Sequence, residues 1–249
     1  MKCSANSKRC RPNDATNSPS LRVAEPLLRG YRMLMLSSVL KYPEVPAEEL
    51  LRPEPLADGA QPEERLVVCG VSWNRYLAFD KALGDDRPSP RLYYLDRELE
   101  IMTTSNEHER VKKWIAGFLE IYFEHLGIEV IPRGQATMRL DPKEVGAEPD
   151  ESWCIDRDKP YPDLVLEIAL TSGGVPKLEI YRRFKVPEVW VWRGKKLDIF
   201  VLGQSDTYKP LSNSQLLPDL DISLIERCTA TNSWRQARQM FRAGLRPAR

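Results

Sequence analysis

An aspartate that follows a proline, and a glutamate set inside an apolar run, are the residues of this chain best suited to chemistry. Segment 148–150 reads Glu-Pro-Asp and ends at Asp150, and segment 162–168 reads Pro-Asp-Leu-Val-Leu-Glu-Ile and contains Glu167. Burying an anion costs roughly 2–5 kcal/mol unless a cation, a proton or hydrogen-bond donors compensate it. A divalent metal ion is one such compensation. Pairing of Glu167 with a nearby Arg or Lys at a strand end is the other interpretation.

The direction of Glu167 follows from the alternation of side chains along a strand. Glu167 lies on the face opposite the purely aliphatic one, which we expect to be the core. That aliphatic face comprises Leu164, Leu166, Ile168 and Leu170. We expect Glu167 to meet Asp150, delivered by the preceding strand. Two carboxylates repel each other, and a hard divalent cation with oxygen ligands relieves the repulsion.

A lysine follows in the first turn of a predicted helix. Segment 171–174 reads Thr-Ser-Gly-Gly and breaks the strand, and Pro176 is a favoured residue at a helix start. Lys177 then opposes the helix dipole, which disfavours a cation there by up to about 1 kcal/mol. Two interpretations stay open: the amine of Lys177 is solvated, or it points back to the two carboxylates.

The charge balance limits how this chain could bind nucleic acid. Its 249 residues contain 37 Lys and Arg and 36 Asp and Glu, a formal net charge of +1. A nonspecific nucleic-acid coat protein would be strongly basic, so any such contact requires a local patch. Candidates for a phosphate-contacting patch are Arg182, Arg183, Lys185, Arg193, Lys195 and Lys196. A solvated surface is the alternative interpretation of these charges.

Other features bear on the compartment. No run of eighteen apolar residues occurs, so we expect no membrane-spanning segment and no membrane partner. The five cysteines are scattered and lack the close spacing of metal ribbons or redox motifs. Reduced thiols and a cytoplasmic location are the resulting prediction.

The order of predicted elements is typical of an α/β or α+β domain. Residues 1–65 are expected to form a disordered or poorly ordered tail and linker, because their Pro- and Glu-rich end cannot repay the entropy of ordering. The folded domain is expected over 66–245. Its predicted elements are a helix over 72–83, a hairpin of strands 91–95 and 98–102, a helix from 105 or 106 to 127, strands over 129–140, 147–155 and 163–170, a helix over 176–184, strands over 188–192 and 197–202, and a helix over 234–241 laid across the sheet. This succession predicts a mixed central β-sheet flanked by helices.

Together these segments resemble the Uma-two family of restriction-endonuclease-like proteins. The resemblance rests on segments 148–150, 162–168, 171–174 and 186–190, with Lys177, Ile180 and Tyr181 between the last two. It extends from about residue 66 to the final helix. The family belongs to the PD-(D/E)XK nuclease superfamily and is abundant in cyanobacterial genomes, so it implies a restriction-endonuclease-like core.

The resemblance also implies roles for the candidate residues. Asp150 corresponds to the first metal-binding aspartate, and Glu167 corresponds to the acidic residue of the second motif. The superfamily's lysine would stand two residues after Glu167, where this chain has Ala169. Within the family the lysine is supplied by the next helix, and Lys177 is the position that matches.

Two further residues are possible accessories. His108 matches a position where the family often carries histidine, and a solvated or helix-capping role is its alternative. Asp163 also follows a proline and could help to bind metal, whereas a turn or capping role at a strand start is its alternative.

The function implied by the resemblance is metal-dependent hydrolysis of DNA phosphodiester bonds. Asp150 and Glu167 would hold Mg²⁺ or Mn²⁺, and Lys177 would orient the attacking water or stabilise charge on phosphorus. DNA is the expected partner, and a homodimer is expected because a two-strand cut requires two active sites or the repositioning of one. Ala169 motivates the alternative of a catalytically inactive nuclease-fold protein that binds nucleic acid or a protein. A structural role in a mobile-element or defence cluster is a third possibility.

Overall fold

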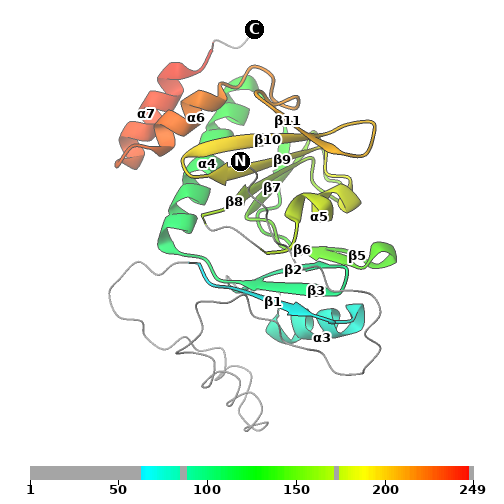
Figure 1. Ribbon diagram of the computed structural model, residues 1–249. Coiled ribbons are helices and arrows are strands. Elements are labelled where there is room, and N and C mark those ends of the chain that lie inside the picture. The colour runs from blue at the N-terminus through cyan, green and yellow to red at the C-terminus, as the bar shows by residue number, and fades with distance from the viewer. Residues whose placement is uncertain (1–62, 85–88, 171–173, 247–249) are drawn as a thin grey trace, which may run out of the picture.

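A computed structural model describes residues 63–84, 89–170 and 174–246, so the predicted tail lies, up to residue 62, outside the described residues. Within the described ranges the chain forms two β-sheets and five α-helices (Figure 1). The predicted mixed α+β class is confirmed. None of the helices in these ranges has both the length and the apolar character needed to cross a membrane.

The first sheet is antiparallel, with the strand order β1-β3-β2-β6-β5. Its strands are β1 (Arg65–Cys69), β2 (Arg91–Leu95), β3 (Glu98–Met102), β5 (Met138–Leu140) and β6 (Val145–Ala147). β2 and β3 form the predicted hairpin with the predicted bounds, because Asp96 and Arg97 both adopt the positive φ of a tight two-residue turn. Helix α3 (Trp73–Leu83), which Ser72 caps, packs on one face of this sheet.

The second sheet is mixed and has the order β11-β10-β9-β8-β7-β4. Its strands are β4 (Val130–Pro132), β7 (Glu151–Ile155), β8 (Leu164–Ile168), β9 (Glu188–Arg193), β10 (Lys196–Leu202) and β11 (Tyr208–Leu211). β8 and β9 run parallel, joined through helix α5 (Lys177–Phe184). Leu164, Leu166 and Ile168 lie in the largest core with helix α4 (Asn106–Leu126), as predicted. Leu170, predicted on the same face, lies beyond the end of β8 and is 38% exposed, so the prediction was wrong for that residue.

The second sheet is the mixed sheet predicted from the sequence, but the chain also crosses into a separate antiparallel sheet that was not predicted. The strand predicted over 129–140 is two strands, β4 and β5, and the strand predicted over 147–155 is β6 and β7. Each pair is divided between the sheets. Pro149 lies at the second crossing and cannot donate a ladder hydrogen bond, so it favours an interruption there. Asp150 therefore lies between the sheets instead of within a strand.

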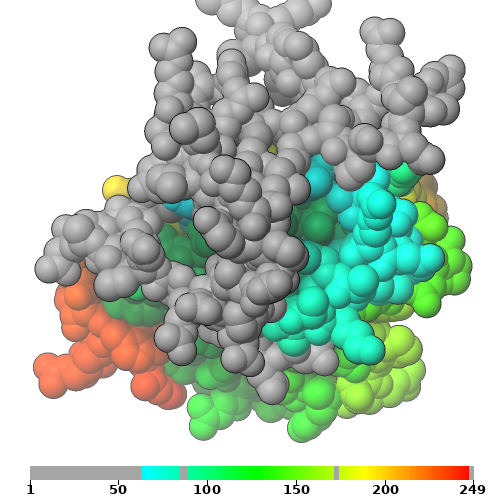
Figure 2. Space-filling view, turned by 90° about the horizontal axis from the view of Figure 1, so that it is seen from below, coloured from blue at the N-terminus to red at the C-terminus, as the bar shows by residue number. Residues whose placement is uncertain are grey.

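The last helix also differs from its prediction. Helix α7 (Trp234–Gly244) packs on α4 and on α6 (Ile222–Thr229), a helix that the sequence patterns did not reveal. The ring of Phe241 stacks on Phe118 of α4 with centroids 4.9 Å apart. A Cβ at Gly117 would lie 2.6 Å from the Trp234 ring, so the glycine allows this close approach. Figure 2 shows the C-terminal segment, orange to red, at one edge of the molecule.

Gly146 in β6 leaves room for the side chain of Tyr76. A Cβ there would lie 2.6 Å from Cζ of Tyr76, whose ring is fully buried and stacks on Tyr94. We expect Gly146→Ala to lower the free energy of unfolding by about 1–3 kcal/mol, measured by urea denaturation. Gly203→Ala is the control, because its nearest neighbour would be 3.5 Å away. Equal stability of the Gly146→Ala variant and the wild type would contradict this packing.

Candidate active site

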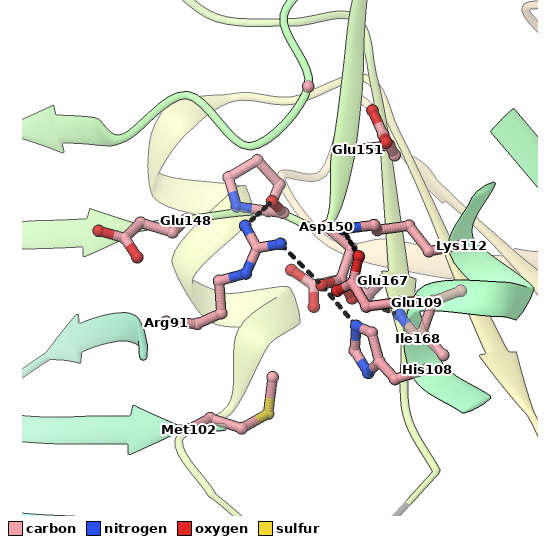
Figure 3. Close-up of polar contacts among 12 residues, drawn as sticks. Arg91, Met102, His108, Glu109, Lys112, Glu148, Asp150, Glu151, Glu167 and Ile168 are labelled. Atoms are coloured by element: carbon pink, nitrogen blue, oxygen red, sulfur yellow. Dashed lines mark hydrogen bonds and ion pairs between the residues drawn. The ribbon is translucent and has the colours of Figure 1, made fainter. Parts of the chain in front are cut away.

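Asp150 lies at the junction of the two sheets and is almost wholly buried. Its Oδ2 accepts a hydrogen bond of 2.7 Å from the backbone N–H of Ile168 in β8. Its Oδ1 lies 2.8 Å from Nε2 of His108 and 3.9 Å from Nη2 of Arg91. Figure 3 shows these groups around Asp150, with Glu167 beside it. Two cations and a backbone N–H thus compensate one carboxylate.

Glu167 projects from β8 toward the first sheet, where two phenols and one amine surround it. Its carboxylate accepts hydrogen bonds from the hydroxyls of Tyr93, at 3.0 Å to Oε2, and of Tyr181. Nζ of Lys177 lies 2.6 Å from Oε2 and 3.8 Å from the ring centroid of Tyr93. Of the two interpretations of Lys177, the structure therefore supports the one in which the amine points back to the carboxylates.

Asp150 and Glu167 interact electrostatically. Burial raises the pKa of Glu167; the charge of Lys177 opposes the increase, and the charge of Asp150 adds to it. Burial also acts to raise the pKa of Asp150, but His108, Lys177 and Arg91 outweigh it, so this pKa is lowered. Asp150 accepts from the backbone N–H of the residue that follows Glu167, and Figure 3 shows Glu167 beside Asp150, so the two carboxylates converge as expected from the sequence.

His108 is fully buried, so the solvated alternative is wrong. Ser105 caps α4, and its hydroxyl accepts from the backbone N–H of His108. The imidazole lies between Asp150 at Nε2 and Glu63 at Nδ1. Burial acts to lower the pKa of His108, but these two carboxylates outweigh it and raise the pKa to about 9. The imidazolium therefore predominates at neutral pH.

Asp163 does not join this group. Its Oδ2 accepts from the backbone N–H of Ile155 at 2.7 Å and from Nζ of Lys159 at 2.6 Å. It precedes β8 whereas Glu167 lies near the other end of that strand, about 13 Å away at the rise of a β-strand. Asp163 therefore does not reach the carboxylate pair, and the accessory metal role expected for it is not supported. Its contacts fit the alternative of a turn or capping role.

Sequence reasoning missed Arg91, which is buried beside Asp150. Nη1 of Arg91 donates to the carbonyl of Pro149 at 3.3 Å. Within the part of the chain that the structure describes, its Nε and Nη2 have no hydrogen-bond acceptor. Buried polar donors normally have acceptors, so this guanidinium retains capacity for another anion. Its position next to Asp150 depends on the junction of the sheets, for which the sequence carries no local signal.

Glu100 was also missed, and it positions the chain ahead of Lys177. It is fully buried in β3, and its Oε2 accepts from the backbone N–H of Val175 at 2.7 Å. Its Oε1 lies 3.2 Å from Nε of Arg65. A Cβ at Gly174, where φ is +89°, would also collide with the Glu100 carboxylate. Glu100 therefore fixes the start of α5 and, through it, the direction of Lys177.

The donor chemistry of this site can be compared with the needs of Mg²⁺. Over the described ranges, no three His, Cys, Asp or Glu side chains form a group that could hold a metal ion without other ligands. Mg²⁺, however, is commonly bound by one or two carboxylates, and waters and substrate phosphates complete its octahedron. Asp150 and Glu167 offer that carboxylate pair, so their chemistry fits the ion.

A family comparison covers the same residues. The Uma2 family model, described as "Putative restriction endonuclease", matches residues 73–232, more than half of the chain. This chain belongs to the Uma2 family. The matched range contains His108, Asp150, Glu167 and Lys177, and the resemblance drawn from the sequence is confirmed.

Comparison with solved structures returns a protein described as a "putative nuclease belonging to DUF820" from Anabaena variabilis ATCC 29413. It is 10% identical to this Uma2 chain, with a TM-score of 0.43, and the alignment covers 69% of this chain and 99% of that one. No curated protein matches.

The pKa of His108 makes stability depend on pH. Between its ordinary pKa of about 6.5 and the folded value of about 9, the folded chain keeps a proton that the unfolded chain releases. The free energy of unfolding should therefore fall as pH rises through this window, by on the order of 3 kcal/mol. We expect His108→Gln to be less stable at pH 7 and to show a flatter profile, measured by urea unfolding from pH 6 to pH 10.

The matched control is His125→Gln, which changes the other histidine of the chain. His125 is exposed and contacts the carbonyl of Arg246, far from the carboxylates in the fold. It should keep the pH dependence of the wild type. Loss of the dependence in the His125 variant, with its retention in the His108 variant, would contradict the assignment.

Proposed function

We propose that this Uma2 protein is a metal-dependent endonuclease that hydrolyses phosphodiester bonds in DNA. The observation that carries the proposal is the meeting of Asp150, Glu167 and Lys177 at one buried junction, with the amine 2.6 Å from the glutamate. Structural ion pairs seldom require two interacting carboxylates in one buried place, because each raises the cost of burying the other. Metal-dependent phosphodiester hydrolysis uses such a pair to hold its metal ion.

Each residue has a part in the proposed reaction. Asp150 and Glu167 would hold Mg²⁺ or Mn²⁺, which when bound supplies an acidified water and neutralises phosphate charge. Lys177 would hold its ammonium toward a phosphate oxygen and stabilise the charge that develops there. The open N–H groups of Arg91 would donate to the same anionic group. His108 would orient Asp150 and, being protonated, would not act as a general base.

The binding-only alternative is motivated by Ala169, which stands where the superfamily has its lysine. Lys177 weakens the argument for an inactive protein, because its amine reaches Glu167 from the next helix and could replace the missing lysine. DNA is the substrate class that we propose from the family. The homodimer and the cytoplasmic location stay predictions.

A nicking assay tests the proposal. We expect purified protein with Mg²⁺ or Mn²⁺ to nick supercoiled plasmid, and we expect chelator, Asp150→Asn or Glu167→Gln to abolish nicking, because each substitution removes a carboxylate that the metal needs. Asp163→Asn is the matched control, since it changes the other aspartate that follows a proline. It should retain nicking.

The outcomes separate the two functions. Metal-dependent nicking that both site variants lose and Asp163→Asn keeps would support a nuclease. If the folded wild-type protein binds DNA but cuts neither DNA nor RNA with either metal, the binding-only alternative takes its place. Nicking that survives in Asp150→Asn would exclude this site as its source.

Arg91 gives a separate test of how the phosphate is held. We expect Arg91→Gln to lower the single-turnover rate roughly 10²-fold, because a preorganised donor to the developing charge is lost. Arg97→Gln is the control, since Arg97 is exposed at the hairpin turn. Urea unfolding of both variants establishes that they are folded. An Arg91→Gln rate equal to that of the wild type would show that this guanidinium does not contact the reacting phosphate.

A further inference from the structure

The C-terminal helix α7 has a concentrated positive surface. Arg235, Arg238 and Arg242 recur at intervals of three and four residues and so lie on one side of the helix, and Arg246 follows two residues after its end. All four are exposed, and we call them the arginine face. The sequence over 227–249 contains six arginines and no Asp, Glu or Lys. The net charge of the whole chain is only +1.

The arginine face differs from the basic patch expected from the sequence. In that patch Arg182 pairs with Glu179 and Asp206, and Arg183 pairs with Asp96 at 2.7 Å. Lys185, Arg193 and Lys196 also have carboxylate partners. No ion pair joins any arginine of the arginine face to a carboxylate within the described ranges. Its charge is therefore available to an external anion.

Aromatic rings link the arginine face to the candidate active site. The guanidinium of Arg238 lies 5.5 Å from the ring centroid of Trp234, which is 5.4 Å from that of Trp114 in α4. The guanidinium of Arg110 lies 4.8 Å from the Trp114 centroid, and Arg110 is two residues after His108. The row from Arg110 to Arg238 thus starts at the active-site end of α4 and leads to α7, which lies alongside it (Figure 1).

The chemistry of this surface favours a nucleic-acid backbone over a membrane. A helix that binds lipid uses an exposed apolar face for insertion. In α7 the apolar residues Ala237 and Phe241 are buried in the core with α4 and α6, and the exposed side presents arginine and glutamine. The helical rise places Arg235 and Arg242 about 10 Å apart, comparable to three intervals of about 3.4 Å between successive phosphates of one strand, measured along the axis of duplex DNA.

We infer that the arginine face binds the sugar-phosphate backbone of duplex DNA and positions the duplex along α4 toward the junction of the sheets. The inference rests on the proposed function in taking DNA as the substrate. Binding by this surface, however, requires neither metal nor cleavage. It can therefore be measured while the site is inactive.

The test measures the affinity of the full chain for a labelled duplex of about 30 base pairs in chelator, across a series of salt concentrations. The test variant changes Arg235, Arg238 and Arg242 to Gln, and a second variant changes the same three residues to Lys. The control changes Arg75, Lys81 and Lys209 to Gln, three exposed basic residues that form no ion pair with a carboxylate of the described residues. Far-ultraviolet circular dichroism establishes that each variant is folded.

We expect the Gln variant to bind at least tenfold more weakly near 0.1 M salt, and the slope of log affinity against log salt to fall by about 2 to 3. The affinities of the Lys variant and the control for the duplex should stay within about threefold of the wild-type affinity. The Lys variant keeps the positive charge on the arginine face, and the control removes charge elsewhere. Equal weakening in the control, or wild-type affinity in the Gln variant, would overturn the inference.

Two further measurements separate this inference from its alternatives. Binding of the wild type to phosphatidylserine vesicles or single-stranded RNA, lost in the Gln variant, without binding to the duplex, would replace DNA with that partner and overturn the inference. A wild type that binds the duplex through these arginines, yet does not nick plasmid with Mg²⁺ or Mn²⁺, would support the inference and contradict the proposed function. Failure of the DNA-binding inference can therefore be distinguished from failure of the proposed nuclease function.

Discussion

Repulsion between Asp150 and Glu167 is the constraint to which the rest of the site responds. Both are about 1% exposed, and neither could stay charged in such a place without compensation. The chain supplies that compensation from several elements: Arg91 and Tyr93 from β2, His108 from α4, and Lys177 and Tyr181 from α5. Because these elements are distant in sequence, the site exists only once both sheets have formed.

The junction of the two sheets explains why the carboxylates meet. The chain leaves the first sheet after β6 and enters the second at β7, with Asp150 in the crossing. β8 then pairs with β7 and brings the backbone N–H of Ile168 to Asp150, while the side chain of the preceding residue, Glu167, projects toward the first sheet. Glu100 fixes the segment ahead of α5, so that Lys177 reaches Glu167. The geometry of the site is therefore a consequence of topology.

Local signals in the sequence predicted much of this fold. The hairpin, the starts of α3 and α4, and the alternation within β8 depend on turn chemistry and periodicity within a few residues, and the structure has them as predicted. The division into two sheets could not be read from the sequence, because short strands such as β5 and β6 carry little periodicity. For the same reason Arg91 and Glu63 were missed: their partners are set by the packing of distant segments, and Glu63 lies where composition favours a tail. Lys177 was identified through the family, and its direction could not be derived from the sequence.

Anomalous scattering from crystals soaked in Mn²⁺ would test most directly whether the two carboxylates form a metal site. We expect a peak about 2.0–2.3 Å from an oxygen of Asp150 and an oxygen of Glu167, with the Lys177 amine displaced from Oε2 of Glu167. Waters or phosphate should complete the coordination. Absence of a peak at the junction in crystals that bind Mn²⁺ elsewhere, with Lys177 still paired to Glu167, would contradict the account.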